Sequence, residues 1–217
     1  ISAGNEAKFL KDFTQVVEQA GNQLVALNVY PQNIERLVYM AQALNRVGRT
    51  LVLEPNYYRL LRPYMAPEAA LATINWDGDS KLPAQDVLTW DQVQDVPGQY
   101  AVQVDYEQHH DYIFSLSEGI YIHSNGVPLG AYDARYQPWL EGIVKAGWQF
   151  YHGHVSGHAS TQDLCLVNYV VGAKLVVPWH SFKPERYAEA LINLGLTPWL
   201  PSLDTTYSAD QIKSLAD

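Results

Sequence analysis

The stretch QLVALNVYPQNIERLVYMAQALNRVGRTLVLE, residues 23–54, decides the fold class of this chain. It opens with a short β-rich run, continues with an amphipathic run and closes with a second β-rich run, RTLVLE. In the middle run, apolar residues recur at the spacing of one helical face, and Gly48 follows as a helix stop. Strand, helix and strand at this spacing predict a right-handed crossover between two parallel strands. The apolar residues of the helix are Ile34, Leu37, Val38, Ala41 and Leu44.

The same alternation of strand and helix signals runs along the rest of the chain, and residues 66–98, rich in Pro, Asp and Gly, are expected to form an irregular connection. The sequence therefore predicts an α/β fold, mainly a parallel sheet flanked by helices. Further helices are expected at residues 5–21, 56–65, 134–147, 160–173 and 183–195, and further strands at 99–106, 119–124, 148–152 and 174–180.

Composition limits the class of protein. With 217 residues the chain forms one large domain or two small ones, and a 47% hydrophobic content is a globular value. No apolar run approaches the roughly 20 residues of a membrane span, and no membrane partner is expected. The single cysteine, Cys165, lies in an apolar context and predicts a buried thiol in a reducing compartment, the cytoplasm. A formal charge of −9 weighs against a nucleic-acid coat protein, although an acidic enzyme can still bind phosphates locally.

Four histidines lie where expected strands end. FYHGHVSGHASTQDL, residues 150–164, contains three of them between a strand and a helix, and His180 ends the next expected strand, 22 residues after His158. Ligand sites of open parallel sheets gather beyond the carboxyl ends of the strands, so His158 and His180 are predicted to share one pocket. The alternative is that the glycines serve a connection and the histidines are ordinary half-exposed polar residues.

These motifs resemble the beta-CASP branch of the metallo-β-lactamase superfamily, which contains RNase J-type RNA-processing nucleases and related hydrolases. HVSGHAS is similar to the family's H-x-S-G-H turn, and VVPWHSFKPERY is similar to its strand that ends in Pro-x-His. Residues 28–54 are similar to the opening of the inserted beta-CASP domain. The resemblance implies that residues 1–12 end an N-terminal metallo-β-lactamase part, that 13–150 form the beta-CASP domain, and that 151–217 form the C-terminal βαβα return segment of the metallo-β-lactamase fold.

The resemblance also implies roles for particular residues. His180 would ligate zinc, and His158 would protonate the leaving oxygen or stabilise its charge. His154 and Ser156, on the same turn, would contact a substrate phosphate oxygen. Glu6 stands where the family carries an acidic residue that hydrogen-bonds the motif histidine.

Three further residues near these motifs are weighed against ordinary structural explanations. Asp12 is a second acidic residue near Glu6, and a solvated helical carboxylate is the usual explanation for either. Asn33 and Arg36 are candidates to face the same site, although an arginine on an amphipathic helix more often marks its solvated side.

Two departures from the family pattern bear on function. The H-x-H-x-D-H metal cluster does not occur in the 217 residues, and neither EQHHDY (107–112) nor HGH (152–154) has its spacing. The family order places that cluster N-terminal to this chain, so we expect a fragment without metal-dependent turnover of its own. In addition, LEPNYYRLL (53–61) replaces a Gly-Arg-Ser-like turn. Tyr57 and Tyr58 can stack on bases or pack in the core, and packing is the expected role.

Two functions from different classes follow. The first is a fragment of a zinc-dependent phosphodiesterase, a ribonuclease whose substrate is RNA. The second is a metallo-hydrolase with a substrate other than nucleic acid, in which this part is a binding or self-association module. Formation of a homo-oligomer is left open.

Overall fold

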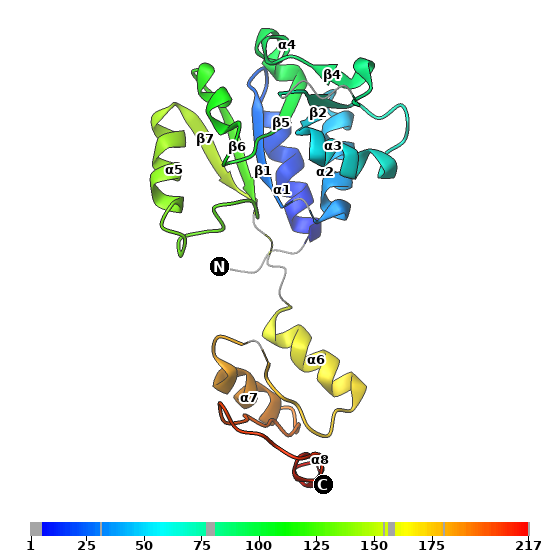
Figure 1. The fold of residues 1–217 in the computed structure, drawn as a ribbon, viewed down its shortest axis with the longest axis vertical. Helices are drawn as coiled ribbons and strands as arrows, with labels where there is room; N and C mark the ends of the chain where they lie inside the picture. Colours follow the sequence, from blue (N-terminus) through cyan, green and yellow to red (C-terminus); the bar gives the residue numbers. More distant parts are fainter. Residues whose placement is uncertain are drawn as a thin grey trace. The chain divides into compact units, whose positions relative to one another are not determined.

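The computed structural model describes residues 6–30, 32–76, 81–153, 155, 159–179 and 181–216 (Figure 1). The chain divides into two compact units, Ile1–Val155 and Ser156–Asp217. The predicted boundaries after residues 12 and 150 concern a family relationship and stay predictions. The first helix, α1 (Glu6–Gln19), runs across the earlier of them.

The first unit is built on a seven-stranded, all-parallel sheet in the order β4-β3-β2-β5-β1-β6-β7. The predicted α/β fold with a parallel sheet flanked by helices is therefore confirmed. The strands are β1 (Val25–Val29), β2 (Thr50–Leu53), β3 (Leu71–Ile74), β4 (Val87–Leu88), β5 (Tyr100–Gln103), β6 (Gly119–Ser124) and β7 (Trp148–His152).

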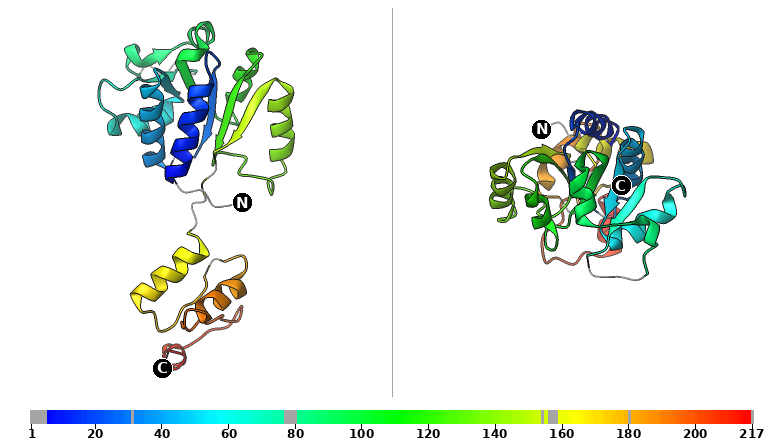
Figure 2. Two further views of the ribbon diagram at one scale, coloured as in Figure 1. Left: turned by 180° about the vertical axis from the view of Figure 1, so that it is seen from behind. Right: turned by 90° about the horizontal axis from the view of Figure 1, so that it is seen from above.

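Helices cover both faces of this sheet. Along β1, Val25 and Leu27 point into the core beneath α1, α2 and α3, whereas Ala26 points into the core beneath α4, η4 and α5. Figure 2 shows α1 and α2 together on one face of the sheet. This alternation buries every residue of β1, as expected of a central parallel strand. The helices are α2 (Ile34–Arg46), α3 (Pro55–Leu61), η1 (Arg62–Tyr64), η2 (Ala84–Asp86), α4 (Trp90–Asp95), η3 (Pro97–Gln99), η4 (His110–Ser115) and α5 (Tyr136–Lys145).

The expectation of an irregular connection over residues 66–98 was wrong, because this segment contains β3, β4 and α4. The strands are short, four and two residues, and lie between Pro-, Asp- and Gly-rich turns that dominate the local signal. The pairing of β3 with β2 makes this short run a strand, and that pairing is a long-range contact.

The second unit contains α6 (Thr161–Val171), α7 (Pro184–Ile192) and α8 (Ala209–Ser214), and α6 and α7 contribute to a small core. Ser160 caps α6 and forms a capping box with Asp163, and the thiol of Cys165 is buried, as predicted. The strand expected at residues 174–180 does not form among the described residues there, where Val176 makes only an isolated bridge to Pro198. A longer strand needs a neighbouring strand to supply its hydrogen bonds, and the described part of this unit offers only that bridge.

No helix among the described residues is long and apolar enough to cross a membrane.

Candidate functional site

The candidate site lies where the carboxyl ends of β1, β6 and β7 meet, and Arg36 is its central charge. Arg36 lies in the first turn of α2, whose N-cap is Asn33, and the Asn33 Oδ1 accepts a hydrogen bond from the Arg36 backbone N–H at 3.1 Å. The chain leaves β1, turns and enters α2 at this edge, so the helix start places the Arg36 side chain beside the strand ends.

Arg36 is only 6% exposed, and its guanidinium is held by three side chains. Its Nε and Nη2 donate to the two carboxylate oxygens of Glu6 at 3.1 and 2.5 Å. Its Nη1 donates to Ser124 Oγ at 3.2 Å and to Asn125 Oδ1 at 2.7 Å. A buried charge is tolerated only when it is paired and hydrogen-bonded, so these contacts fix the guanidinium in one geometry.

Asn125 links this arginine to the segment after β7. Its Oδ1 accepts from the Val155 N–H at 3.2 Å, and its Nδ2 donates to the Val155 C=O at 3.1 Å. The Asn125 backbone has a φ of 63°, a left-handed conformation that asparagine adopts more readily than most residues. Val155 is the second residue of the H-V-S-G-H motif, so these two hydrogen bonds fix that one residue of the motif.

Gly153 allows the chain to pass close to the core just before Val155. Its N–H donates to the His123 carbonyl at 2.8 Å, and a Cβ at this position would lie 2.7 Å from the Phe9 ring. Any larger residue would therefore push the strand end away from α1.

Two described histidines also lie near this edge. The Tyr136 hydroxyl and the His152 Nε2 are 2.6 Å apart, and burial raises the pKa of Tyr136. His123, on β6, is buried with its ring 4.9 Å from that of Trp139.

Glu6 is the predicted site residue that the structure describes, and its partner is Arg36. Arg36 itself is buried, so the alternative explanation, that it marks the solvated side of the helix, was wrong. Sequence reasoning missed Asn125, for which the signal was an asparagine directly after a strand. The other predicted site residues, His154, Ser156, His158 and His180, lie outside the described residues, and their roles stay predictions.

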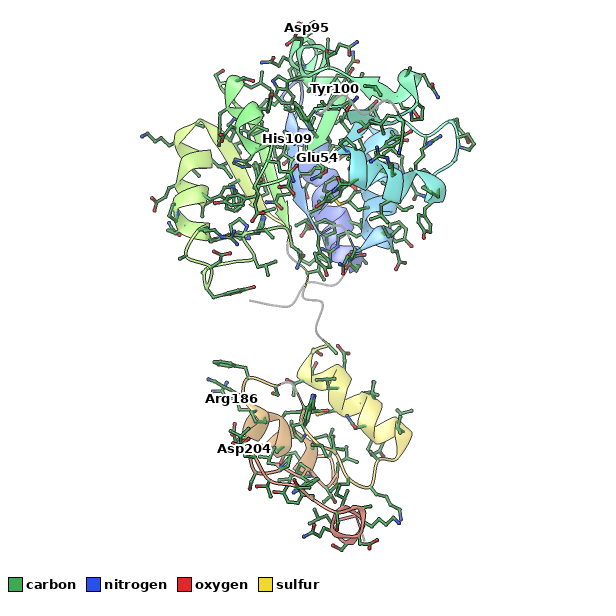
Figure 3. All side chains as sticks on the ribbon, viewed as in Figure 1. Glu54, Asp95, Tyr100, His109, Arg186 and Asp204 are labelled. Carbon is green, nitrogen blue, oxygen red and sulfur yellow. The ribbon has the colours of Figure 1, made fainter. Side chains whose placement is uncertain are left out.

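The histidines of EQHHDY have partners other than a metal. The ring of His109 pairs with the carboxylate of Glu54, and Figure 3 shows these two residues next to one another. His110 is buried and accepts a hydrogen bond from Trp139 Nε1 at 3.0 Å, and burial lowers its pKa to about 4. Tyr57 and Tyr58 are buried in the core, so the packing role expected for them is confirmed.

Zinc, which the resemblance implies, does not fit the described residues on their own. No three His, Cys, Asp or Glu side chains in the described part of the chain are grouped so that they could hold a metal ion. A catalytic zinc usually needs three protein ligands, and the implied ligand His180 is not among the described residues.

No protein-family model and no curated protein matches this chain. Among solved structures, the chain is similar to a protein of unknown function from Enterococcus faecalis V583, with a TM-score of 0.77 and 26% identity over 93% of this chain. The match covers 45% of the Enterococcus chain, so this chain spans less than half of that protein. A lysine decarboxylase from Selenomonas ruminantium aligns at 12% identity over 96% of this chain and 54% of its own, with a TM-score of 0.26, from which no shared fold follows.

Proposed function

We propose that this chain is the substrate-binding portion of a phosphodiesterase of the beta-CASP type and that its substrate is RNA. The observation that carries the proposal is the pair of hydrogen bonds between the Asn125 side chain and the Val155 backbone. These bonds hold Val155, the second residue of the H-V-S-G-H motif, at the carboxyl edge of a parallel sheet, where α/β proteins place their ligand sites.

Each part of the motif has a proposed role. His154 and Ser156 contact a non-bridging phosphate oxygen, and His158 donates a proton to the leaving oxygen as its negative charge develops. An imidazole suits that role because its ordinary pKa lies near neutral pH. Glu6 and Arg36 act as positioning residues, because Glu6 holds Arg36, Arg36 holds Asn125, and Asn125 holds Val155.

Metal chemistry enters this proposal only through His180, a candidate zinc ligand. Since the described residues do not complete a zinc site, no step of the proposal runs through a metal. A zinc titration by calorimetry, with His180→Ala beside the wild type, tests this ligand. Submicromolar binding that the substitution abolishes would mean that other residues of this chain complete the site.

The direct test is an NMR titration of the amide-labelled chain with a short single-stranded RNA. We expect the amide signals of Gly153, Val155 and Asn125 to shift, and Asn125→Gly to weaken the response. Lys145→Ala is the matched control, because Lys145 is exposed and precedes the opposite, amino-terminal end of β7. Amide shifts confined to the amino-terminal ends of the strands, or no shifts at all, would rule out RNA binding at this turn.

A second candidate function is a binding or self-association module in a hydrolase that does not act on nucleic acid. The observation that favours it is the apolar surface of α6, where Leu166, Val167, Val170 and Val171 are 59–74% exposed. The net charge of −9 also gives no general attraction to RNA. Concentration-dependent sedimentation together with an absence of RNA-induced shifts would favour this alternative.

A further inference from the structure

A second group of polar side chains lies at the same edge of the sheet, at the carboxyl ends of β2 and β5. Glu54 directly follows β2, and Asp105 lies two residues after β5. These neighbouring strands send their connections to opposite faces, because α3 packs in one core and η4 in the other. A reversal of this kind is the place where open α/β sheets bind ligands.

The buried Glu54 is hydrogen-bonded to the half-buried His109, which lies next to it in Figure 3. The His109 Nδ1 lies 3.0 Å from both carboxylate oxygens of Glu54, whose side chain is 6% exposed. Burial raises the pKa of Glu54, and the hydrogen bond from His109 opposes that rise. A carboxylate oxygen accepts hydrogen bonds, so Nδ1 is assigned as the donor to Glu54, and in that tautomer Nε2 is the acceptor nitrogen of the ring. The His109 side chain is 15% exposed.

A second carboxylate and a buried hydroxyl lie close to this pair. Asp105 is half-buried, its N–H donates to Glu54 Oε1 at 3.3 Å, and its Oδ1 accepts from the Glu107 N–H at 2.8 Å. Its charge and that of Glu54 add to the effect of burial in raising the pKa of Tyr57 to about 12. On the other side of Asp105, burial raises the pKa of Tyr121, and the Asp105 charge adds to that effect. The Tyr121 hydroxyl is fully buried and makes no hydrogen bond of good geometry with the described residues, although Asn28 and Trp139 lie near it.

An aromatic stack continues from His109 toward solvent. The His109 ring stacks on Trp76 with 4.6 Å between centroids and 17° between planes, and the Tyr112 ring lies 4.3 Å from Trp76. Tyr112 is 45% exposed, so the stack has an accessible end. Aromatic side chains of this kind stack on unpaired nucleobases.

We propose that Asp105 and His109 read a nucleobase that carries an exocyclic amino group, cytosine being the simplest, within the single-stranded RNA of the proposed function. The inference rests on that function for the nature of the ligand. The Asp105 carboxylate and the His109 Nε2 accept hydrogen bonds, which matches the N4 amino donor of cytosine. The carboxylates Glu54 and Asp105 repel phosphate. The group bound at the carboxyl ends of β2 and β5 is therefore the base and not the sugar-phosphate backbone of the RNA.

The test compares cytidine with uridine, a pair in which an amino group is replaced by a carbonyl. In an NMR titration of the full chain, cytidine is expected to shift the His109 ring signals and the Asp105 amide, and to bind about tenfold more tightly than uridine. Asp105→Asn replaces one acceptor with an amide that can donate to uridine, and it should abolish the preference. His109→Gln is the second variant, and Lys145→Ala, at the opposite edge, should change nothing.

Equal binding of the two nucleosides, or no shift of His109 and Asp105 at millimolar nucleoside, overturns the inference. Nucleosides carry no phosphate, so this outcome is separable from failure of the proposed function. RNA-induced shifts at Val155 without a cytidine preference leave the function standing and remove the base site. A cytidine preference without any RNA effect at Val155 retains the base site and removes the phosphodiesterase proposal.

Discussion

The Asn125 side chain is hydrogen-bonded to both backbone groups of Val155, 30 residues away in the chain, as acceptor at 3.2 Å and as donor at 3.1 Å. The same Oδ1 accepts from Arg36 at 2.7 Å. One asparagine therefore connects the start of α2 to Val155, which lies three residues after the end of β7 and inside the histidine motif. The position of Val155 thus depends on a residue outside the motif.

Replacing Asn125 with Gly should lower the free energy of unfolding of the first unit by about 1–3 kcal/mol, since the two hydrogen bonds with Val155 and the one from Arg36 are lost. Asn125→Ala should cost about 1 kcal/mol more, because alanine is strained at a φ of 63° whereas glycine is not. Urea unfolding measures both. Faster amide exchange at Val155 in both variants is also expected, and unchanged exchange there would show that the asparagine does not hold the segment.

The Arg36–Glu6 pair should be sensitive to the shape of the cation. Arg36→Lys keeps the charge but cannot form the two-pronged contact with Glu6, so we expect a loss of about 2–3 kcal/mol. Glu6→Gln should cost less, about 1 kcal/mol, because the Glu6 side chain is 49% exposed. Thermal unfolding at matched salt concentrations reports both.

Lys8→Gln is the control for these two variants. It removes an exposed pair with Asp12 at helical spacing and should change stability by no more than about 0.5 kcal/mol. A loss for Arg36→Lys as small as that of the control would mean that the buried contacts contribute little.

The sheet could be predicted in part because α2 carries a helical period between two β-rich runs, which became β1 and β2. Its strand order could not, because β5 inserts between β2 and β1 through pairings 50 and 76 residues apart, which leave no local signal. The strands β3 and β4 were missed because they are short and lie between Pro-, Asp- and Gly-rich turns that dominate the local signal.

The candidate site divides in the same way. Glu6 was a candidate because of the family resemblance, whereas the sequence left open whether its partner Arg36 faces the site or the solvent, because an amphipathic pattern cannot distinguish a buried, paired arginine from an exposed one. Asn125 carries no spacing signal, since its role arises from a left-handed backbone and a contact between distant strand ends. Glu54 and His109 are 55 residues apart and meet only because β2 and β5 are neighbours.

His110 should make stability fall in weakly acidic solution. Burial lowers its pKa from 6.5 to about 4 in the folded chain, so below pH 6.5 the unfolded chain binds the proton first. The contribution of the buried, uncharged His110 to the free energy of unfolding is therefore fully present above pH 6.5. It decreases as the pH falls toward 4, by up to about 3 kcal/mol. Protonation would also break the hydrogen bond from Trp139.

The charge of Asp111 opposes the lowering of the His110 pKa. The rings of Tyr106, Phe114 and Tyr121 surround the imidazole.

The measurement is urea unfolding from pH 7.5 to 4, with His110→Gln beside the wild type. Glutamine retains an acceptor for Trp139 but does not titrate, so the variant should lack that part of the decrease. Parallel curves for the two proteins would mean that other groups cause the acid sensitivity.

The apolar surface of α6 should make the chain self-associate. Cys165 is the buried residue of this helix, and the leucines and valines that follow it are mostly exposed, which is unusual for a helix on a solvated surface.

Replacing Leu166 and Val170, 60% and 74% exposed, with glutamate should abolish concentration-dependent sedimentation and reduce binding of a hydrophobic dye. The urea midpoint should stay within about 0.5 kcal/mol of the wild type, because substitutions of exposed residues change stability little. Leu203→Glu, at a site outside α6 that is 90% exposed, is the matched control and should leave association unchanged. If the double variant instead lowers stability while the wild type remains monomeric, these side chains serve the core of their own unit and the surface is not an interface.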